Sequence, residues 1–487
     1  MEKSWVNSAW QPDGDEPADQ GAGSDLHLDL AGGGGVRARL MGALREAIRS
    51  GRLVPGTRLP PYRTLALDLG IARNTVAEAY AELVEEGWLT ARQGSGTRVA
   101  RRATPMEPDP AAPGLARRTR RRVLYDLMPS SPDAAAFPRS AWATSARRAL
   151  AAAPSDAFGV GDPRGRVELR RALAEYLARA RGVRAEADRI VICAGFAHAL
   201  RLLCRLLDGP VAVESYGLDF HRSIVTDAGS ATIPLTVDAH GARVEELHGT
   251  RARAVLLTPA HQYPTGGPLH PERRGAVVDW ARASGALVLE DDYDGEFRYD
   301  RDPVGAVQGL DPDRVVYLGS ASKSLSPALR LGWMVLPGSL VDRVVEAKGP
   351  REVWSGVVDQ LTLADFLSCG AYDRHLRRMR KIYRRRRDQL TATLARRAPH
   401  IRVNGIAAGL HAVLQLPAGT EAAALRAATR LGLALDGLSA YRHPGSAMAP
   451  RDGLVIGYGT PPEHLFTAAV DALCLALPDP PQADEAR

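Results

Sequence analysis

The sequence is poor in cysteine and has no long apolar stretch. Its 487 residues include four cysteines, Cys193, Cys204, Cys369 and Cys474, with no CxxC pair and no framework spacing. This predicts structural thiols in a reducing, cytosolic compartment. No run reaches the roughly 18 apolar residues of a membrane span, and the polar, acidic N-terminus has no hydrophobic signal core. Secretion and membrane insertion are therefore not expected.

Arginine, by contrast, is abundant. Lysine and arginine together number 63 against 56 acidic residues, so the net charge is +7, a balance that suggests a polyanionic partner. A chain of this length is also too long for one domain. Residues 1–25 are rich in Gly, Asp, Pro and Gln and are predicted to form a disordered tail, because they have little to bury.

Residues 26–99 have the pattern of a small helical domain that ends in a β-hairpin. The predicted elements are helices from Val36, at residues 62–69 and from Arg73, and strands at residues 88–92 and 97–99. The second and third helices are joined by a tight turn at Gly70, which is the helix-turn-helix arrangement. In that arrangement the later helix enters the major groove of DNA. The alternative to a DNA-binding domain is a small helical cap whose arginines are ordinary, satisfied surface residues.

The string GRLVPGTRLPPYRTLALDLGIARNTVAEAYAELVEEGWLTARQGSGTRV, residues 51–99, resembles the winged-helix domain of GntR-type regulators over its whole length. The resemblance implies binding of double-stranded DNA at an operator with paired half-sites. The residues that it places at the DNA are Arg63, Arg73, Asn74, Thr75, Arg92 and Gly94. One departure is Pro61-Tyr62, where relatives carry two serines, because a serine there is expected to cap the short helix and touch a phosphate.

Residues 100–124 form a segment rich in proline and arginine, with seven arginines and two acids. We predict an interdomain linker that can lie near DNA phosphates. A merely solvated run of charge fits the composition equally well.

Residues 125–478 alternate apolar runs with helical stretches, which predicts a mostly parallel sheet covered by helices on both faces. The predicted strands lie at residues 190–193, 211–213, 255–257, 286–289, 315–318 and 333–336, with helices such as 168–181 and 271–284 between some of them. A long arginine-rich helix at residues 371–397 leads into a smaller C-terminal α+β part, and residues 479–487 are predicted to be a tail.

Lys323 follows the predicted strand at residues 315–318 and a turn of small residues, in a chain that has few lysines. A lysine buried at the end of a strand can lose its proton and attack a carbonyl, because loss of solvation disfavours the ammonium form. With Ser320, Ser322 and Arg330 nearby to hold a phosphate, this is the chemistry of a Schiff base to pyridoxal phosphate. A surface lysine on a loop is the simpler alternative.

Pyridoxal phosphate also needs an anion at its ring nitrogen and a donor at its phenolic oxygen. The predicted strand at residues 286–289 runs into EDDYD (290–294), and the carboxyl end of such a strand is where ligands bind. Asp291 is the predicted partner of the ring nitrogen, with Asp292 as second choice, and Tyr293 is the predicted donor. A solvated acidic loop and a metal site are the alternatives, but no further metal ligands are evident, so no metal is predicted.

A phosphate cup is predicted where a strand ends and a helix begins, since backbone amides at a helix N-terminus bind anions. The residues predicted to form this cup are Gly195, Phe196, Ala197, Ser320, Ser322 and Arg330.

Five segments resemble fold-type-I aminotransferases: DPRG (162–165), AGFAHAL (194–200), TPAHQYPTG (258–266), EDDYDGEFRY (290–299) and GSASKSLSPALRLG (319–332). More narrowly, HQYPTG with EDDYD-EFRY is similar to the aminotransferase-like half of MocR/GabR regulators, in which this half follows a GntR domain. The resemblance implies a multidomain protein: a winged helix-turn-helix domain and then an α/β pyridoxal-phosphate transferase fold, assembled as a homodimer. It also implies that Lys323 binds the cofactor.

Some positions depart from the family's pattern. Leu218 stands where an aromatic residue normally stacks on the cofactor ring, and Tyr216 is the nearest substitute. GLVIGYG (453–459) lacks the arginine that aminotransferases place there for a substrate carboxylate. Phe220 stands where GABA-responsive members have an arginine, the nearest being Arg222. A GABA-type effector is therefore not expected.

Three functions fit these observations. The first is a transcription regulator whose second domain binds pyridoxal phosphate and senses it, an amine or an amino acid; by resemblance its target is pyridoxine biosynthesis. The second is an active aminotransferase with an accessory DNA-binding domain, and the third is a DNA-binding protein whose second domain only dimerises. We expect the first, because a complete DNA-reading domain precedes a Lys323 site that lacks substrate arginines.

Overall fold

A computed structural model of the chain describes residues 28, 30, 34–92, 96–101, 123–129, 131–299, 304–349 and 356–480. The chain divides between Thr119 and Arg120 into two compact units. The predicted tail at residues 1–25 lies outside the described residues, as do most of the predicted linker at 100–124 and most of the tail at 479–487.

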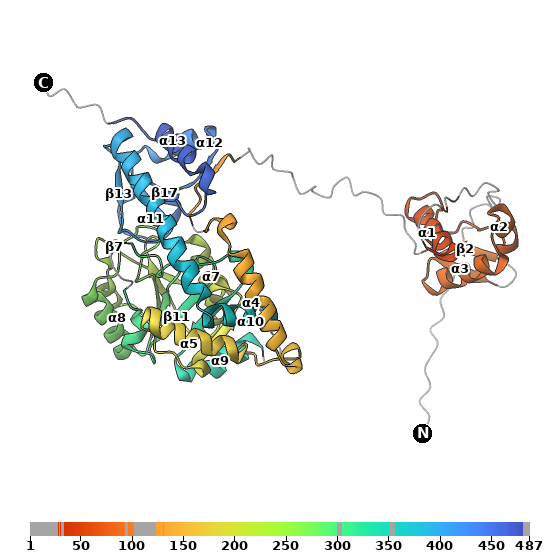
Figure 1. Ribbon diagram of the computed structural model, residues 1–487, viewed down its shortest axis with the longest axis horizontal. Helices are drawn as coiled ribbons and strands as arrows, with labels where there is room; N and C mark the ends of the chain where they lie inside the picture. Colours follow the sequence, from red (N-terminus) through yellow and green to blue (C-terminus); the bar gives the residue numbers. More distant parts are fainter. Residues whose placement is uncertain are drawn as a thin grey trace. The chain divides into compact units, whose positions relative to one another are not determined.

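The first unit is a winged helix-turn-helix, as predicted (Figure 1). Its described elements are α1 (Val36–Arg49), α2 (Tyr62–Asp68), α3 (Arg73–Glu85), β1 (Leu89–Arg92) and β2 (Gly96–Val99). Gly70, at a φ of 66°, makes the turn between α2 and α3, a backbone conformation that a side chain would strain. Leu40, Leu44 and Leu83 are fully buried in one apolar cluster, where α1 packs against α3.

The core of the second unit is a seven-stranded sheet. Its strand order is β4 (Ile190–Cys193), β12 (Gly332–Val335), β11 (Val315–Ser320), β10 (Leu287–Asp291), β9 (Ala254–Leu257), β5 (Val211–Glu214) and β6 (Thr232–Leu235). β12 runs antiparallel to both neighbours, and the other adjacent pairs are parallel. The prediction of a mostly parallel sheet is confirmed.

β6 is the strand of this sheet that the sequence pattern did not predict. Its four residues include Pro234, and only Leu235 is fully buried. Proline is tolerated there because β6 is an edge strand. A short, partly exposed strand with a proline carries too little apolar signal to be recognised from sequence.

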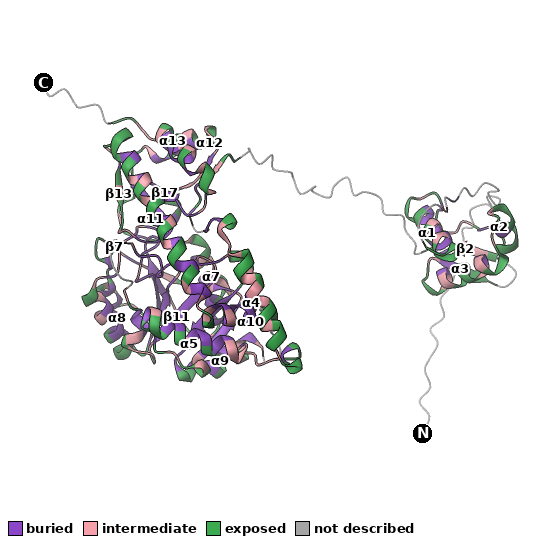
Figure 2. Cartoon of the chain, viewed as in Figure 1, coloured by how far each residue is buried: buried purple, intermediate pink, exposed green. Residues whose placement is uncertain are grey.

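Helices cover both faces of the sheet, which explains the continuous apolar runs of its strands. Within β5, Val211 and Val213 face one apolar cluster and Ala212 faces another, because successive side chains of a strand point to opposite faces. Figure 2 shows buried residues in the interior and exposed residues on the outer helix faces. The surrounding helices are α4 (Arg139–Ala152), α5 (Val167–Arg181), α6 (Phe196–Cys204), α7 (Asp219–Asp227), α8 (Pro271–Ser284), α9 (Val341–Lys348) and α10 (Val357–Ser368).

A smaller α+β part follows the long helix α11 (Ala371–Arg397), whose bounds are those predicted. In Figure 1, α11 extends from the large sheet to this small part. The small part has an antiparallel sheet in the order β13 (Arg402–Asn404), β14 (His411–Gln415), β17 (Gly453–Gly457) and β16 (Asp436–Gly437). The remaining elements are α12 (Glu421–Arg430), α13 (Phe466–Ala476), β3 (Tyr125–Asp126), β7 (Val237–Asp238), β8 (Gly241–Ala242) and β15 (Leu433–Ala434). Within the described ranges, no helix has both the length and the apolar character that a bilayer crossing requires.

A buried ion pair connects α5 to the end of β10. The Arg181 guanidinium donates to both carboxylate oxygens of Asp292, at 2.6 and 2.9 Å, and both side chains are 1% exposed. Tyr317, from β11, donates its hydroxyl to the same carboxylate at 2.8 Å. Burial by itself lowers the pKa of Arg181, but the charge of Asp292 raises it above its usual value, so the guanidinium stays charged and the pair is complete.

We expect Arg181→Ala to destabilise the second unit by about 3–5 kcal/mol, because it leaves the Asp292 carboxylate buried without its partner. Chemical denaturation of the purified chain, followed by circular dichroism, measures this loss. Arg397→Ala is the control, since Arg397 pairs with Asp471 at 2.6 Å on the surface, where an ion pair contributes about 0–1 kcal/mol. Equally small losses for both variants would show that the Arg181 pair does not support the fold.

Candidate functional site

A cavity of about 270 Å³ lies at the carboxyl ends of β5, β9, β10 and β11, next to the first turns of α6 and α7. Parallel α/β sheets bind ligands at this end. The residues lining it are Phe196, Ala197, Val213, Glu214, Gly217, Leu218, Phe220, His221, Arg222, Leu256, Thr258, Tyr263, Asp291, Tyr293, Ser320, Ser322, Lys323 and Arg330.

Lys323 lines this cavity from the turn that follows β11. Burial lowers the pKa of its ammonium group to about 8, and the carboxylates of Asp291 and Asp294 limit the shift. An amine with this pKa is more often unprotonated near neutral pH than an ordinary lysine, so it is a better nucleophile. This position does not fit the alternative of a surface lysine.

The two candidate carboxylates for a ring nitrogen have different surroundings. Asp291 lines the cavity, whereas Asp292 binds Arg181 and Tyr317. Burial, together with the charge of Asp292, raises the pKa of Asp291 well above its usual value, and the charge of Lys323 opposes this shift. Of the two, Asp291 is therefore the carboxylate that a ligand in the cavity can contact.

The residues predicted to bind a phosphate come together around the N-terminus of α6. The members that line the cavity are Phe196, Ala197, Ser320, Ser322 and Arg330. Gly195, the N-cap of α6, has a φ of 91°, and a Cβ there would lie 3.6 Å from Nη1 of Arg330. A Cβ on Gly332 would lie 2.6 Å from the Gly195 Cα, so β12 can approach the start of α6 this closely only with a glycine at position 332. Arg330 has a φ of 51°, and backbone strain of this kind concentrates at functional sites.

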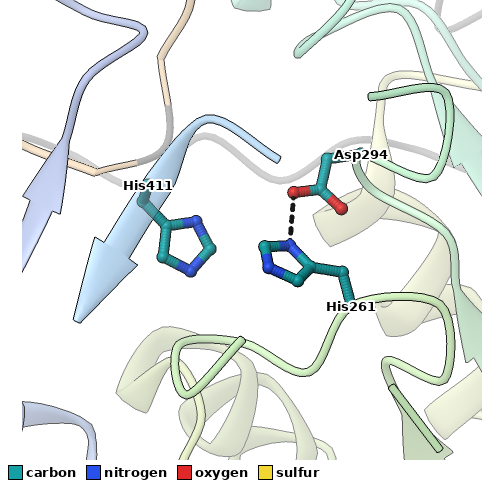
Figure 3. A group of neighbouring side chains, drawn as sticks. All are labelled: His261, Asp294 and His411. Carbon is teal, nitrogen blue, oxygen red and sulfur yellow. Dashed lines mark hydrogen bonds and ion pairs between the residues drawn. The ribbon is translucent and has the colours of Figure 1, made fainter. Parts of the chain in front are cut away.

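Tyr293 also lines the cavity, and its hydroxyl lies 3.0 Å from Nδ1 of His261. The same Nδ1 lies 2.9 Å from Oδ2 of Asp294, and His411 lies beside this pair (Figure 3). Among the described residues, His261, Asp294 and His411 form a group whose ligand atoms all lie within 4.8 Å of one another, as a metal ion would require. The sequence predicted no metal site, because His411 reaches the group from the small C-terminal part.

Several cavity residues were not predicted from the sequence. These are Val213, Glu214, Gly217, His221, Leu256, Thr258 and Tyr263. The His221 ring lies 4.4 Å from that of Phe196, measured between centroids, and burial lowers its pKa to about 3. His221 follows Leu218 by one helical turn, which is the signal that could have identified it.

Tyr216, the nearest substitute for the missing aromatic residue in the sequence, does not face the cavity. Tyr216 is fully buried and does not belong to the cavity lining. Its ring lies under the Arg451 guanidinium at 4.9 Å, so it serves the packing of the small part. Leu218 faces the cavity instead.

Arg222 lines the cavity, but its guanidinium is used within the protein. It donates to the carbonyl oxygens of Gly217 and Tyr441 at 2.8 and 3.1 Å, and to Asp219 at 3.1 Å. These bonds leave fewer donors for a ligand carboxylate.

The residues predicted to contact DNA lie on the surface of the first unit. Arg63, Arg73, Asn74 and Arg92 are exposed, Thr75 is partly buried, and Gly94 lies outside the described residues. No side chain caps α2. The Tyr62 ring lies 5.1 Å from the Arg73 guanidinium, which also donates to the Tyr62 hydroxyl at 3.4 Å. Tyr62 thus orients the first residue of α3 instead of capping α2.

Comparison with known proteins agrees with this geometry. Residues 37–99 match the family described as bacterial regulatory proteins, gntR family, and residues 130–445 match aminotransferase class I and II. The HTH-type pyridoxine biosynthesis transcriptional regulator PdxR of Corynebacterium glutamicum is 34% identical over 427 residues, which cover 87% of this chain and 92% of that protein. The probable rhizopine catabolism regulatory protein MocR of Rhizobium meliloti is 34% identical over 454 residues, covering 87% and 90%.

The chain belongs to the MocR/PdxR-type transcriptional regulators. In this chain a GntR domain precedes an aminotransferase class I and II domain. The second unit of this MocR/PdxR-type regulator is similar to the kynurenine aminotransferase of Pyrococcus horikoshii, with a TM-score of 0.66 at 24% identity over 74% of this chain and 91% of that one. That likeness shows the fold of the unit.

We expect Lys323 to react with a small neutral aldehyde at a rate that rises with pH and levels off near pH 8, because only the unprotonated amine attacks and its pKa is about 8. Borohydride trapping and peptide mass spectrometry measure the reaction at this residue. Nα-acetyl-lysine is the control, and its rate should keep rising to about pH 10.4. If Lys323 follows the profile of the control, burial does not lower its pKa.

Proposed function

We propose that this MocR/PdxR-type regulator binds pyridoxal phosphate in the cavity around Lys323 and transmits the presence of the cofactor to its DNA-binding unit. The observation that carries the proposal is that Lys323, Asp291 and the anion cup lie in one cavity. An amine, a carboxylate and a phosphate site are the groups that this cofactor requires. We also propose that the protein acts in the cytoplasm, where its DNA lies.

The residues present fit the cofactor. The raised pKa of Asp291 indicates that this buried carboxyl is short of positive charge, which a protonated ring nitrogen would supply. Gly195 and Gly332 bring the amides of α6 close to Arg330, and amides with a guanidinium suit a phosphate dianion. The hydroxyl of Tyr293 belongs to the same cavity.

When bound, pyridoxal phosphate supplies an aldehyde that condenses with amines and a ring that withdraws electrons. We propose that Lys323 provides the amine that binds it, that Asp291 orients its ring and that Tyr293 donates to its phenolic oxygen. The phosphate is held by Gly195, Phe196, Ala197, Ser320, Ser322 and Arg330. Burial of the cavity weakens screening by water and strengthens these contacts.

The signal, in this proposal, is the cofactor itself or a small amine. Phe220 is half exposed and lines the cavity at the position where, by resemblance, GABA-responsive members have an arginine. The guanidinium of the nearby Arg222 donates to the protein's own backbone. The name of the Corynebacterium glutamicum relative refers to pyridoxine biosynthesis. We propose the same class of target genes for this chain.

We propose that two copies of the chain bind an operator with paired half-sites, as dimeric helix-turn-helix proteins do. Cofactor binding then shifts the populations of two arrangements of the dimer, and with them the spacing of the paired DNA-reading helices. Such a shift requires that the cofactor binds one arrangement more tightly than the other.

An active aminotransferase is the second candidate function. It is favoured by the match of residues 130–445 to aminotransferase class I and II. Steady conversion of an amino acid and a keto acid by the purified chain would support it over the proposal of a sensor.

We expect the wild-type chain to gain an absorbance band in the visible range with pyridoxal phosphate, and Lys323→Ala to lack it, because the variant has no amine at this position. The measurement is an absorbance spectrum after removal of unbound cofactor. Lys381→Ala, which changes an exposed lysine of α11, is the control and should keep the band. A wild-type chain that stays colourless would show that pyridoxal phosphate does not bind, and DNA binding would be the one proposed function that remains.

We expect Arg73→Ala to weaken binding to an operator selected from a random DNA pool by about 1–3 kcal/mol and to relax its sequence preference, because Arg73 begins the helix that reads base edges. Fluorescence anisotropy with selected and shuffled DNA measures both effects. Arg45→Ala is the control, since Arg45 pairs with Glu86 at the opposite end of α3. Unchanged discrimination in Arg73→Ala would show that α3 is not the recognition helix.

A further inference from the structure

His261, Asp294 and His411 form a buried group next to Tyr293, and the proposed function assigns no role to them. We infer that His261 and Asp294 form a hydrogen-bonded pair that holds the Tyr293 hydroxyl in the orientation needed to contact the cofactor, and that they are positioning residues and not metal ligands. This inference rests on the proposed binding of pyridoxal phosphate and names two further residues of that site.

Two hydrogen-bonding contacts converge on one nitrogen atom. Nδ1 of His261 lies 3.0 Å from the Tyr293 hydroxyl and 2.9 Å from Oδ2 of Asp294. His261 is 3% exposed and Asp294 is 2% exposed, so water does not compete for these bonds. A buried hydrogen bond to a charged carboxylate is among the stronger ones in proteins.

The carboxylate determines which nitrogen of His261 carries the proton. An ionised carboxylate only accepts hydrogen bonds, so a bare Nδ1 facing Oδ2 at 2.9 Å would place two lone pairs against each other. We therefore assign the proton to Nδ1, which donates to Asp294 and to the oxygen of Tyr293. Because that oxygen then accepts from His261, the O–H of Tyr293 is left to donate to a second acceptor. The Asp294 side chain is one such acceptor, and a ligand oxygen in the cavity that Tyr293 lines is the other.

Tyr293 also keeps its proton. Burial, reinforced by the charge of Asp294, raises the pKa of its phenol well above the usual value. The side chain is therefore a donor across the physiological pH range, as the predicted contact with a phenolic oxygen requires.

Gly409, in the small C-terminal part of the second unit, leaves space for the side chains of His261 and Asp294. Gly409 has a φ of 70°, and a Cβ there would lie 2.3 Å from Oδ2 of Asp294 and 2.5 Å from Cε1 of His261. Any side chain at this position would push the two residues apart. The segment before β14 thus closes over the His261–Asp294 pair without displacing it.

A metal ion would require a different protonation state of His261. His411 is neutral, because burial lowers its pKa well below the usual value, and its Nε2 donates to the carbonyl oxygen of Pro264 at 3.1 Å, which leaves its Nδ1 able to bind a metal. Nδ1 of His261 is shared by Asp294 and Tyr293. A metal ion at Nδ1 of His261 would have to replace the proton that this nitrogen donates to Asp294 and Tyr293, so a metal and the hydrogen-bonded pair exclude each other at that atom.

A double-mutant cycle on the full-length chain tests the inference. The dissociation constant of pyridoxal phosphate is measured by visible absorbance for the wild type, Tyr293→Phe, His261→Ala and the double variant. We expect each single variant to weaken binding by about tenfold, the effect of losing roughly one buried hydrogen bond. We expect the double variant to be no weaker than either one, because His261 acts through the hydroxyl that Tyr293→Phe removes.

His261→Asn is the matched variant, since its side-chain amide can place a donor near the position of Nδ1, and it should recover most of the affinity lost in His261→Ala. Additive losses in the double variant, or wild-type affinity in His261→Ala, would overturn the inference while leaving the proposed function intact. One equivalent of tightly bound Zn²⁺ that is lost in His411→Ala would overturn it in favour of a metal site. A wild-type chain that binds no pyridoxal phosphate overturns both the inference and the proposed function.

Discussion

The second unit depends on one physical constraint, which is that charged groups at the carboxyl end of its sheet are removed from water. Burial lowers the pKa of Lys323 to about 8 and raises that of Asp291. Both shifts have the same origin, because a low-dielectric surrounding disfavours the charged form of each group. The protein tolerates this cost at the place where a ligand with an aldehyde and a basic ring nitrogen would relieve it. The electrostatics of the cavity and its proposed cofactor are thus complementary.

Each residue of the segment EDDYD (290–294) has a different partner. Glu290 accepts from the backbone N–H groups of Val307 and Gln308 at 2.8 and 2.9 Å, and Asp292 binds Arg181. Asp291 and Tyr293 face the cavity, and Asp294 binds His261. Successive side chains of β10 point to opposite sides, and the chain bends at Tyr293 and Asp294 after the strand ends at Asp291. The five polar residues are thereby divided between structural support and a ligand site. The structural partners hold the two ligand-facing residues in place.

Much of the fold follows from local sequence signals. α8 has the predicted bounds because Pro271 occupies its first turn and Gly285 ends it at a φ of 72°. The predicted strands appear because their apolar runs suit burial on both faces. β6 could not be found in this way, since its edge position makes a short strand with Pro234 acceptable. The sequence also could not show that Tyr216 packs away from the cavity, because its neighbours come from the small C-terminal part.

The sequence by itself determined the order of the two domains, the type of their elements and the residue types of a carbonyl-binding lysine site, because these depend on periodicity, turns and short motifs. Only the tertiary structure showed that Asp291 lines the cavity while Asp292 binds Arg181, which reaches it from α5. Only the tertiary structure placed His411 beside His261, and Gly409 against Asp294. Such neighbours are brought together by the packing of elements that are distant in the chain. No local pattern encodes a contact of that kind.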